Sequence, residues 1–548
     1  MIIRIAEEAS TKRAPPWIIP GVLCLLYLMQ CAWFLRTQSL TYDEPVHIAE
    51  GLDAWRHGRF QQYNDHPPLA RLWCALPLVG EKWQLEVQQL GNGLHVPRIA
   101  PDPESLAWRA RSMNVVLGLA LAIMLWTAAR RSFSAGAANL ALALYVFSPT
   151  VIANFSVVTT DGAATLLIFA AAVQLVRWRA RPSGAQTFLL GFTLGLMLLA
   201  KFSTPPMFAL ALGWALILKP AGAVANPKKW NWAKAVAVLV VAGCVVWAGY
   251  FLHVSRLTIS HGTLTATFPH WTETIQKPVR TQINLSIGVP AGEYIEGLRT
   301  VARHNARGQA AYFLGQVSPT GGWKLFYPVV MLLKWPAIGW LLFLGSLVLM
   351  LKGRIPSPAK LLVMTSFPAV YMAFAIFSHF NLGDRHVLPV YVFVLFFAGS
   401  LWEASRHWRA AAILLVLAVV LQAADSLRYA PDYLSYFNVW VRPEESYQLL
   451  SGSNLDWGQG LLAVRQYERA HPDEQVWLAY FGSVDPGLYG IKARPLAEGE
   501  RVTGTVVVGA TNLSGEYLRE PTAYRWLLQY PRTEILDHSL HVFKVGTN

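Results

Sequence analysis

The stretch WIIPGVLCLLYLMQCAWF, residues 17–34, carries no charge and is just long enough to cross a lipid bilayer as a helix. It is followed closely by LTYDEPVHIAEG, residues 40–51, in which Asp43 and Glu44 stand directly before Pro45. These acids suit the first turn of a helix, where proline is tolerated and the helix dipole favours negative charge. They also suit a catalytic base held at a membrane surface. The topology of the whole chain is needed to choose between a helix cap and a base.

The composition of the 548-residue chain is that of a membrane protein, since 54% of its residues are hydrophobic and only 14% are charged. Soluble domains carry about 25% charged residues, and a soluble chain of this length could not bury so much apolar surface. The net charge of +14 is therefore tested against the charge of the loops rather than against nucleic acid. The four cysteines match neither a metal-binding spacing nor a disulfide framework.

Eleven apolar runs are long enough, or nearly so, to span a bilayer. They lie at residues 17–36, 110–129, 134–153, 160–177, 186–200, 205–219, 233–253, 325–350, 360–378, 387–402 and 409–424. We expect the first run to be a retained helix, because the preceding MIIRIAEEASTKR is too polar for the apolar part of a signal peptide. The predicted fold class is a polytopic α-helical membrane protein with about 11 transmembrane helices.

The connections between these runs separate by charge. Basic residues gather on alternate connections, at Arg130 and Arg131, at Arg177, Arg179 and Arg181, at Lys219, Lys228 and Lys229, at Lys352, Arg354 and Lys360, and at Arg406 and Arg409. The positive-inside rule makes this side, together with the basic N-terminus, cytoplasmic. The long connections 37–107 and 255–324 are then expected on the extracytoplasmic, periplasmic side of a cell (inner) membrane.

An odd number of helices places the C-terminal segment, residues 425–548, outside as well. This segment loses the membrane pattern: VWLAYF (476–481), TGTVVVGA (503–510) and HVFKV (541–545) predict strands, and stretches 455–468 and 515–529 predict helices. We therefore divide the chain into a transmembrane domain, residues 1–424, and a small extracytoplasmic α/β domain, residues 425–548.

Acids and histidines gather on the predicted outer side, which favours a site that faces outward. In the first loop Asp43 and His47 share a helix face because they are four residues apart. In NDHPPLARL, residues 64–72, two prolines hold His66 rigidly before a helix. Asp161 begins the fourth span, where Thr159 or Thr160 can cap the helix. Each of these residues can also be read as a cap or a turn with no chemistry.

Cations occupy the same predicted side. Lys201 ends the fifth span, and Lys324 and Tyr327 lie at the start of the eighth. Lys334 would lie about two turns further in, where an unpaired ammonium is costly, so a partner anion from the protein or a ligand is expected. Arg385, in HFNLGDRHVLPVY, can bind phosphate oxygens through two donors or pair with a loop acid. Lysines at such ends can also be interface anchors.

The C-terminal segment contains the motif SNLDWGQ, residues 453–459. Ser453 or Asn454 could cap a following helix and place Asp456 in its first turn, which is a purely structural role. Alternatively, Asn454, Asp456 and Trp457 face a cavity of the membrane domain and help to position an acceptor. Both interpretations stay open.

Taken in chain order, these motifs resemble those of the protein-mannosyltransferase-like branch of the GT-C glycosyltransferases, family 39. They are DExxH from Asp43, HPPL from His66, TTDG from Thr159, AKFS from Ala200, GWKLFYPxxxxxKxP from Gly322, GDRHVLP from Gly383 and SNLDWGQ from Ser453. The relatives include dolichyl-phosphate-mannose protein mannosyltransferases and lipid A aminoarabinose transferases. The resemblance covers essentially the whole chain.

The resemblance implies a membrane glycosyltransferase that moves a sugar from a polyprenyl-phosphate-linked donor to an extracytoplasmic protein, lipid or glycan, usually with inversion. It assigns catalysis to the acids of the first outer loop, with Asp43 as the base and Glu44 beside it. Candidates for binding the donor phosphate are Arg385, Lys201, Lys324, Tyr327 and Lys334. Candidates for binding the sugar or the acceptor are His47, His66, Asp161, Asn454, Asp456 and Trp457.

Cofactor use and two rival functions are weighed against this expectation. Some relatives use a divalent metal and others do not, and Glu44, His47 and His66 match no standard metal spacing, so no metal is predicted. A transporter or lipid flippase would place ionisable residues near the midplane and commonly show paired repeats, neither of which is seen. A polymer ligase that uses a lipid-linked donor would instead carry phosphate into the product.

Overall fold

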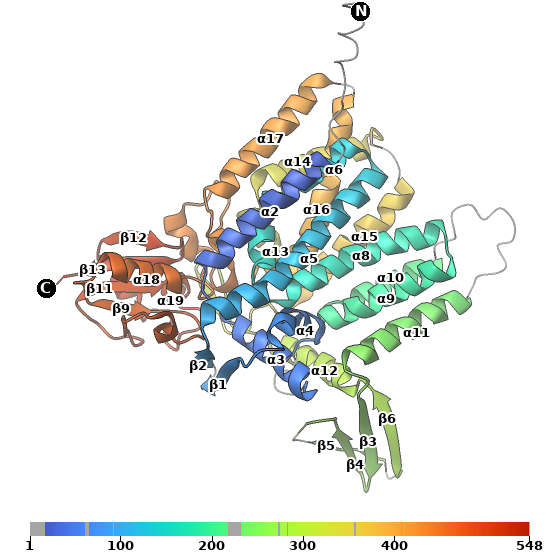
Figure 1. Cartoon of the computed structure of the whole chain (residues 1–548), viewed down its shortest axis with the longest axis horizontal. Helices are drawn as coiled ribbons and strands as arrows, with labels where there is room; N and C mark the ends of the chain where they lie inside the picture. The colour runs from blue at the N-terminus through green and yellow to red at the C-terminus, as the bar shows by residue number, and fades with distance from the viewer. Residues whose placement is uncertain are drawn as a thin grey trace, which may run out of the picture.

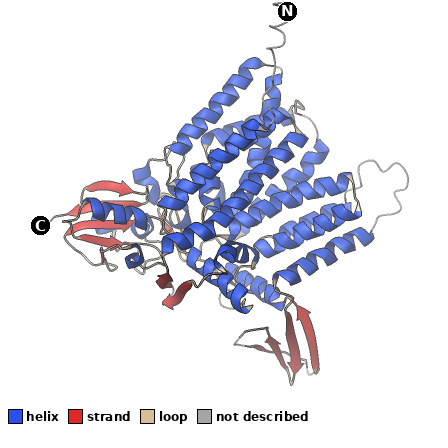
Figure 2. Cartoon of the chain, viewed as in Figure 1, coloured by secondary structure: helices blue, strands red, loops and turns tan. Residues whose placement is uncertain are grey.

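Long apolar helices form the body of the molecule, and strands lie in separate groups on the side away from the N-terminus (Figure 2). In this computed structural model the described residues are 17–546, apart from 61–64, 91–92, 218–231, 272–273, 282, 356–357 and 407. The predicted cytoplasmic residues Lys219, Lys228 and Lys229 lie outside the described residues.

Six single helices in the described ranges are long and apolar enough to cross a membrane. They are α2 (Ile18–Thr37), α5 (Pro103–Ser132), α8 (Thr160–Ala180), α11 (Trp232–Gly249), the run Asp384–Arg406 and α17 (Arg409–Leu427) (Figure 1). The run Asp384–Arg406 comprises the 3₁₀ turn η2 (Asp384–Val387), α16 (Leu388–Gly399) and the 3₁₀ turn η3 (Ser400–Arg406). Two bent pairs raise the count to eight: α6 (Ala135–Val146) with α7 (Pro149–Phe155), and α13 (Phe326–Lys334) with α14 (Ala337–Leu351).

Three shorter apolar helices occupy the remaining predicted runs, namely α9 (Gly184–Ala200), α10 (Pro205–Ile217) and α15 (Pro358–Phe377). Each predicted run is thus helical where the structure describes it, and the polytopic helical fold class is confirmed. The number of helices that fully cross the membrane stays a prediction, because three of them are short and two are bent.

Proline causes both bends. The axis turns by 66° between α6 and α7, where Ser148 precedes Pro149, and by 112° between α13 and α14, where Trp335 precedes Pro336. A proline disfavours the helical conformation of the residue before it, and both residues are accordingly extended. The second bend ends α13 at Lys334.

Two glycines allow close helix contacts that position site residues. A Cβ on Gly195 of α9 would lie 2.6 Å from the Val245 Cβ of α11, so α9 packs against α11 at short distance and sets the position of Lys201 at its end. A Cβ on Gly51 would lie 2.2 Å from the carbonyl oxygen of Arg71. Small residues at such contacts let helix backbones approach closely.

The first outer loop folds into α3 (Glu44–His57), α4 (Leu69–Ala75), the 3₁₀ turn η1 (Leu76–Leu78) and the hairpin β1 (Gln84–Leu90) and β2 (Gly93–Ala100). The second contains β3 (Val254–Ser260), β4 (Thr263–Thr267), β5 (Ile275–Pro278), β6 (Leu285–Pro290), α12 (Gly292–Arg307), β7 (Ala311–Phe313) and β8 (Gln316–Ser318). Strands β3 to β6 form one antiparallel sheet in the order β5-β4-β3-β6. These strands were not predicted.

The C-terminal segment contains the predicted sheet. Its strands are β9 (Val476–Ala479), β10 (Arg494–Pro495), β11 (Gly504–Gly509), β12 (Arg532–Leu536) and β13 (Leu540–Val545), in the order β10-β9-β11-β13-β12. The three predicted strands are therefore confirmed. The helix expected at 455–468 begins later, as α18 (Leu461–Ala470). The helix expected at 515–529 is wrong: α19 (Ala510–Ser514) ends before it, and only the 3₁₀ turn η8 (Arg525–Gln529) lies within it.

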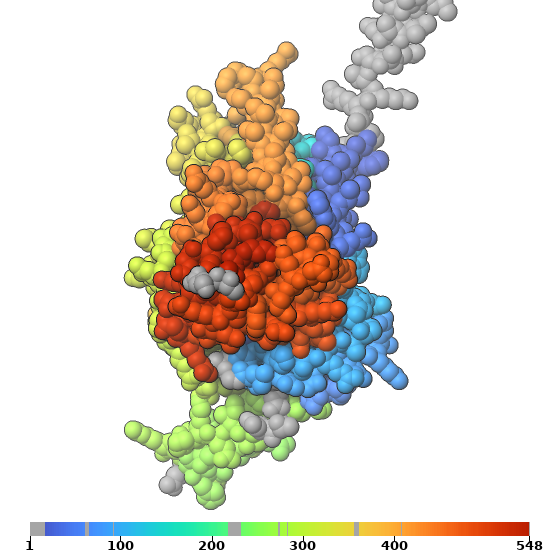
Figure 3. Space-filling model, turned by 90° about the vertical axis from the view of Figure 1, so that its left-hand side faces the viewer, coloured from blue at the N-terminus to red at the C-terminus, as the bar shows by residue number. Residues whose placement is uncertain are grey.

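The C-terminal sheet packs directly on the first outer loop. The backbone N–H of Val96 donates to the carbonyl of Ser483, and that of Asp485 donates to the carbonyl of Val96, which joins β2 to the C-terminal segment. Figure 3 shows the C-terminal segment in red and orange, with the blue first loop directly beneath it. The two regions together surround the residues described next.

Candidate active site

Asp43 and Arg385 meet at the junction of the first outer loop and the run Asp384–Arg406. Nη1 and Nη2 of Arg385 each lie 3.3 Å from Oδ2 of Asp43. Asp43 occupies the N-cap position of α3 but makes no side-chain cap hydrogen bond, so its carboxylate is directed to Arg385 instead. A third of the Asp43 side chain is exposed, which keeps it accessible to a substrate. The cap-only explanation for Asp43 is therefore wrong.

A second acid and a second cation extend this pair. Asp161, in the first turn of α8, accepts from the Lys201 ammonium at 2.5 Å, and Nη1 of Arg385 lies 3.9 Å from its other oxygen. Thr159 caps α8 as expected, by accepting from the Asp161 backbone N–H. The four side chains form an alternating chain of charges, Asp43, Arg385, Asp161 and Lys201. The sequence separated these residues, and the fold brings them together.

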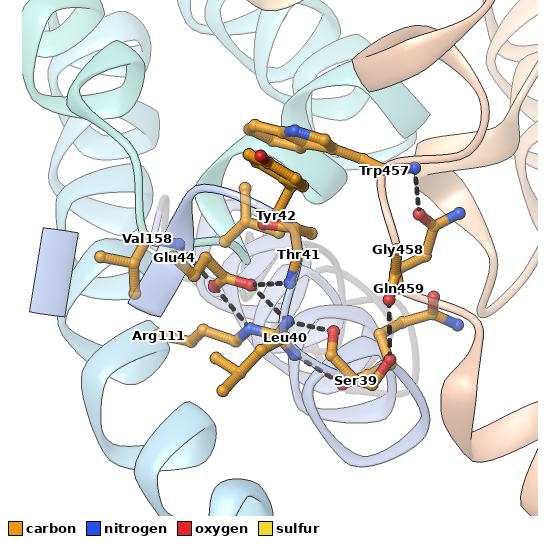
Figure 4. Close-up of polar contacts among 12 residues, drawn as sticks. Ser39, Leu40, Thr41, Tyr42, Glu44, Arg111, Val158, Trp457, Gly458 and Gln459 are labelled. Carbon is orange, nitrogen blue, oxygen red and sulfur yellow. Dashed lines mark hydrogen bonds and ion pairs between the residues drawn. The ribbon is translucent and has the colours of Figure 1, made fainter. Parts of the chain in front are cut away.

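Glu44 differs sharply from its neighbour. It is fully buried, and both of its oxygens accept from the Arg111 guanidinium at 2.7–2.8 Å (Figure 4). The backbone N–H groups of Thr41 and Val158 also donate to it. Glu44 thus ties the first loop to α5 and to the start of α8. A carboxylate held by four donors and closed to solvent is suited to a structural role, which does not favour the catalytic assignment made from the sequence.

The SNLDWGQ motif holds the segment that precedes Asp43. The backbone N–H of Tyr42 donates to the Trp457 carbonyl at 2.9 Å, and that of Ser39 donates to the Gln459 carbonyl at 2.8 Å (Figure 4). The Ser39 hydroxyl also donates to the Gly458 carbonyl. The motif therefore forms a strand-like clamp that fixes the backbone leading into Asp43.

Trp457 also contacts Arg385 directly. The Cζ atom of Arg385 lies 4.0 Å from the centroid of the Trp457 ring, a cation–π geometry that orients the guanidinium. Nε of Arg385 is buried and has no hydrogen-bond partner among the described residues. Arg385 thus retains a donor for an anionic ligand.

Asn454 and Asp456 are buried, and their polar atoms bind protein groups. The Asn454 amide accepts from the Asp384 backbone N–H and donates to the Leu382 carbonyl. The Asp456 carboxylate accepts from the backbone N–H groups of Gly458 and Thr511. These contacts favour positioning roles over contact with an acceptor. The expected cap of a following helix is wrong, because α18 begins only at Leu461.

The two predicted histidines lie side by side. The rings of His47 and His66 are 5.2 Å apart edge to face, and Nε of Arg71 donates to Nδ1 of His47. Burial, followed by the positive charge of Arg71, holds the pKa of both histidines well below the usual range, so both rings are neutral at pH 7. Arg71 also pairs with Asp65 at 2.9 Å.

The remaining predicted cations differ in their surroundings. Lys334 is buried and donates to the carbonyls of Leu434 and Asn454, so backbone oxygens replace the expected partner anion. Tyr327 is buried with its ring stacked near that of His386, and its hydroxyl donates to the Phe380 carbonyl. Lys324 is exposed beside the Phe377 ring. None of these contacts joins them to Asp43.

The electrostatics of Asp43 combine two opposing effects. Burial raises its pKa above that of a free aspartate, and the adjacent Arg385 charge opposes the rise. A raised pKa makes the carboxylate a better proton acceptor than a solvated aspartate. Arg385 contacts only Oδ2, so that contact leaves Oδ1 to a substrate hydroxyl.

Two further observations limit the chemistry. Among the described residues, no three His, Cys, Asp or Glu side chains are placed to hold a metal ion together. A groove of about 1180 Å³ lies along α3 at Leu52, Asp53 and Arg56, facing Trp83 and Trp271. These helix positions are turned away from Asp43 by the helical repeat, so this groove is separate from the charged cluster.

Sequence reasoning missed Arg71 and Arg111. Arg111 is fully buried in α5, within a run that was read only as a membrane span. Its signal was a lone charge inside an apolar helix, which requires a buried partner. Arg71 lay inside the quoted NDHPPLARL motif but was not singled out.

Comparisons with known proteins agree with the motif order. The model of the family described as dolichyl-phosphate-mannose-protein mannosyltransferase matches residues 104–247. No curated protein sequence matches the chain.

Three solved structures resemble this one. The protein O-mannosyltransferase Pmt1-Pmt2 complex of S. cerevisiae, bound to the sugar donor, gives a TM-score of 0.51 at 11% identity and covers 78% of this chain and 91% of that chain. ArnT from Cupriavidus metallidurans, bound to undecaprenyl phosphate, gives 0.48 at 12% identity, covering 97% and 98%. The oligosaccharyltransferase of Archaeoglobus fulgidus gives 0.45 at 12% identity, covering 92% and 71%.

The likeness to the Pmt1-Pmt2 complex shows a shared fold. The matched segment and the motifs agree with that fold. The resemblance to the protein-mannosyltransferase-like branch is thereby confirmed, and the chain is a polytopic membrane protein with the fold of the GT-C glycosyltransferases.

Proposed function

We propose that this protein transfers a sugar from a polyprenyl-phosphate-linked donor to an acceptor on the extracytoplasmic side of the membrane. The observation that carries the proposal is the contact between Asp43 and Arg385, at 3.3 Å. It places a partly exposed carboxylate beside a guanidinium with an unpaired donor. One supplies a base, and the other supplies a site for phosphate.

In the proposed reaction the acceptor hydroxyl oxygen attacks the anomeric carbon of the donor sugar. The bond from that carbon to the phosphate oxygen breaks, and the phosphate takes the electron pair. Asp43 accepts the hydroxyl proton, and attack opposite the phosphate inverts the anomeric centre. The leaving group is a stabilised phosphate, so no general acid is required.

Arg385 and Lys201 are the proposed phosphate-binding cations. They now pair with Asp43 and Asp161, and a donor phosphate would compete for the same guanidinium and ammonium. Binding the phosphate would draw Arg385 away from Asp43 and leave that carboxylate more basic, since an adjacent cation lowers a carboxyl pKa. Charge that grows on the phosphate in the transition state is stabilised by these preorganised donors.

Other predicted residues take supporting roles in this proposal. Glu44 holds the loop through Arg111, Asn454 and Asp456 support the clamp, and Trp457 orients Arg385. His47 and His66 remain candidates for contact with the sugar, because both are neutral and near Arg71. Lys324, Tyr327 and Lys334 are retained only as candidates at the membrane boundary.

The proposal is tested by mass spectrometry of extracytoplasmic glycoconjugates from cells with and without the protein. A product that gains a sugar without phosphate supports it. A product that gains a sugar phosphate would identify a ligase-type transferase instead. Unchanged glycoconjugates together with protein-dependent lipid or solute movement would identify a transporter.

A further inference from the structure

Three aromatic rings form a continuous stack that begins next to Asp43. The rings of Tyr42 and Phe481 are 5.2 Å apart with planes at 6°, and those of Phe481 and Tyr517 are 5.0 Å apart at 7°. Tyr42 belongs to the first loop, and the other two rings belong to the C-terminal segment. Offset parallel stacking fixes ring orientation beyond simple burial. The stack thus extends a rigid aromatic wall away from the proposed base.

Tyr517 is the last ring of the stack and remains accessible. Its side chain is 41% exposed although Phe481 covers one face. Burial of its hydroxyl, followed by the charge of Glu516, raises the pKa of Tyr517 well above the usual range, and the charges of Asp43 and Arg385 also act on it. The ring therefore lies at the edge of the charged cluster.

A carboxylate with spare hydrogen-bonding capacity lies beside this ring. Glu516 is 6% exposed, and its Oε2 has no hydrogen-bond partner among the described residues. Gly452 has a φ of +57°, and a Cβ there would lie 3.2 Å from that oxygen and 3.7 Å from the Tyr517 hydroxyl. The missing side chain leaves both polar atoms uncovered on that side. A buried acceptor without a donor is costly, so a ligand donor is the expected partner.

We propose that Tyr517, backed by Phe481 and flanked by Glu516, binds a pyranose ring of the acceptor, so that the acceptor is a carbohydrate and not a serine or threonine of a protein. A pyranose offers one flat face of C–H groups for the aromatic ring and hydroxyl donors for the carboxylate. Ligand sites commonly combine an apolar wall with a few placed polar groups in this way.

This inference rests on the proposed function, because the base identifies which substrate binds here. Asp43 takes its proton from the acceptor, so the group bound next to Asp43 is the one that carries the attacking hydroxyl. The donor phosphate is assigned to Arg385 and Lys201 of the transmembrane domain, whereas the stack is built from Tyr42 and the C-terminal segment.

The test uses the full-length protein in lipid nanodiscs, with methyl glycosides of glucose, galactose and mannose as probes. Saturation-transfer NMR should show contact between aromatic protons and one face of at least one methyl glycoside. Tyr517→Ala should weaken binding about tenfold, whereas Tyr517→Phe should bind as the wild type does. Tyr530→Ala, a tyrosine of the same region outside the stack, is the matched control and should leave binding unchanged.

Three results would overturn the inference. The first is no binding of any methyl glycoside to the wild type, and the second is equal binding to the wild type and Tyr517→Ala. The third is loss of serine- or threonine-peptide transfer, rather than sugar binding, in Tyr517→Ala. Asp43→Asn separates this inference from the proposed function, because it should abolish transfer but retain glycoside binding.

Discussion

Asp43 and Arg385 lie 342 positions apart in the chain, yet both terminal nitrogens of the guanidinium lie 3.3 Å from one oxygen of the carboxylate. The contact joins a motif of the first loop to a motif before α16. Because Arg385 contacts only Oδ2, the pair is compatible with a base that works through its other oxygen. Trp457 and the unpaired Nε define the remaining environment of the guanidinium.

Arg385→Lys tests the role of the guanidinium fork. Lysine keeps the charge but cannot bind two phosphate oxygens in a fixed plane, so we expect turnover to fall by about 10²–10³. Release of polyprenyl phosphate from a lipid-linked donor measures it. Arg428→Lys is the control, since Arg428 pairs with Asp425 at the surface and should tolerate the change. Full activity in Arg385→Lys would exclude a phosphate-binding fork.

Glu44→Gln should act on stability. The substitution leaves the Arg111 charge fully buried without its carboxylate, which typically costs 3–5 kcal/mol, an estimate of about that size here. Thermal unfolding in detergent should show a clear drop in midpoint. Asp43→Asn should show little change, because Asp43 is partly exposed. A Glu44→Gln protein that unfolds normally but has lost transfer would instead make Glu44 catalytic.

Stability should fall as pH rises from about 4 to about 7, in part through Asp456. Burial raises the pKa of Asp456 from 3.8 to about 7. The folded state therefore holds the proton more tightly than the unfolded state, and this favours folding at low pH and is lost as pH rises. The full effect is on the order of 4 kcal/mol. Melting curves between pH 4 and pH 8 should show a smaller slope for Asp456→Asn, and an equal slope would contradict the assignment.

The orientation in the membrane can be measured with single cysteines, after replacement of the four native ones by alanine. A membrane-impermeant maleimide added to intact cells, or to spheroplasts where an outer membrane is present, should label cysteines at Lys324 and Glu498, both exposed on the predicted outer side. It should not label a cysteine at Arg130, which is exposed at the predicted cytoplasmic end of α5. Labelling of Arg130 without Glu498 would reverse the topology.

The helices were predictable because membrane spans need long apolar runs, and the predicted runs are helical in the described chain. Their bends were harder to predict, although Pro149 and Pro336 mark both positions. The strands β3 and β4 also had a signal. VSRLTIS and TLTAT alternate apolar and polar residues around His261 and Gly262, a pattern typical of a hairpin.

The site was predictable in its members more than in their roles. The motifs named Asp43, Asp161, Lys201 and Arg385, and the fold places them together. Glu44 looks identical to Asp43 in the sequence, and only the fold shows that Arg111 encloses it. The stack of Tyr42, Phe481 and Tyr517 joins residues from distant segments with no shared motif, so no sequence pattern could reveal it.

The most direct test of the central claim compares Asp43→Asn with Asp53→Asn in proteoliposomes supplied with a lipid-linked sugar donor and membrane acceptors. Both acids lie on or beside α3, are about one-third exposed and pair with an arginine, so they form a matched pair. We predict that Asp43→Asn lowers sugar transfer by about 10²–10⁴ while Asp53→Asn keeps it. Transfer by Asp43→Asn at the wild-type rate would show that Asp43 is not the base.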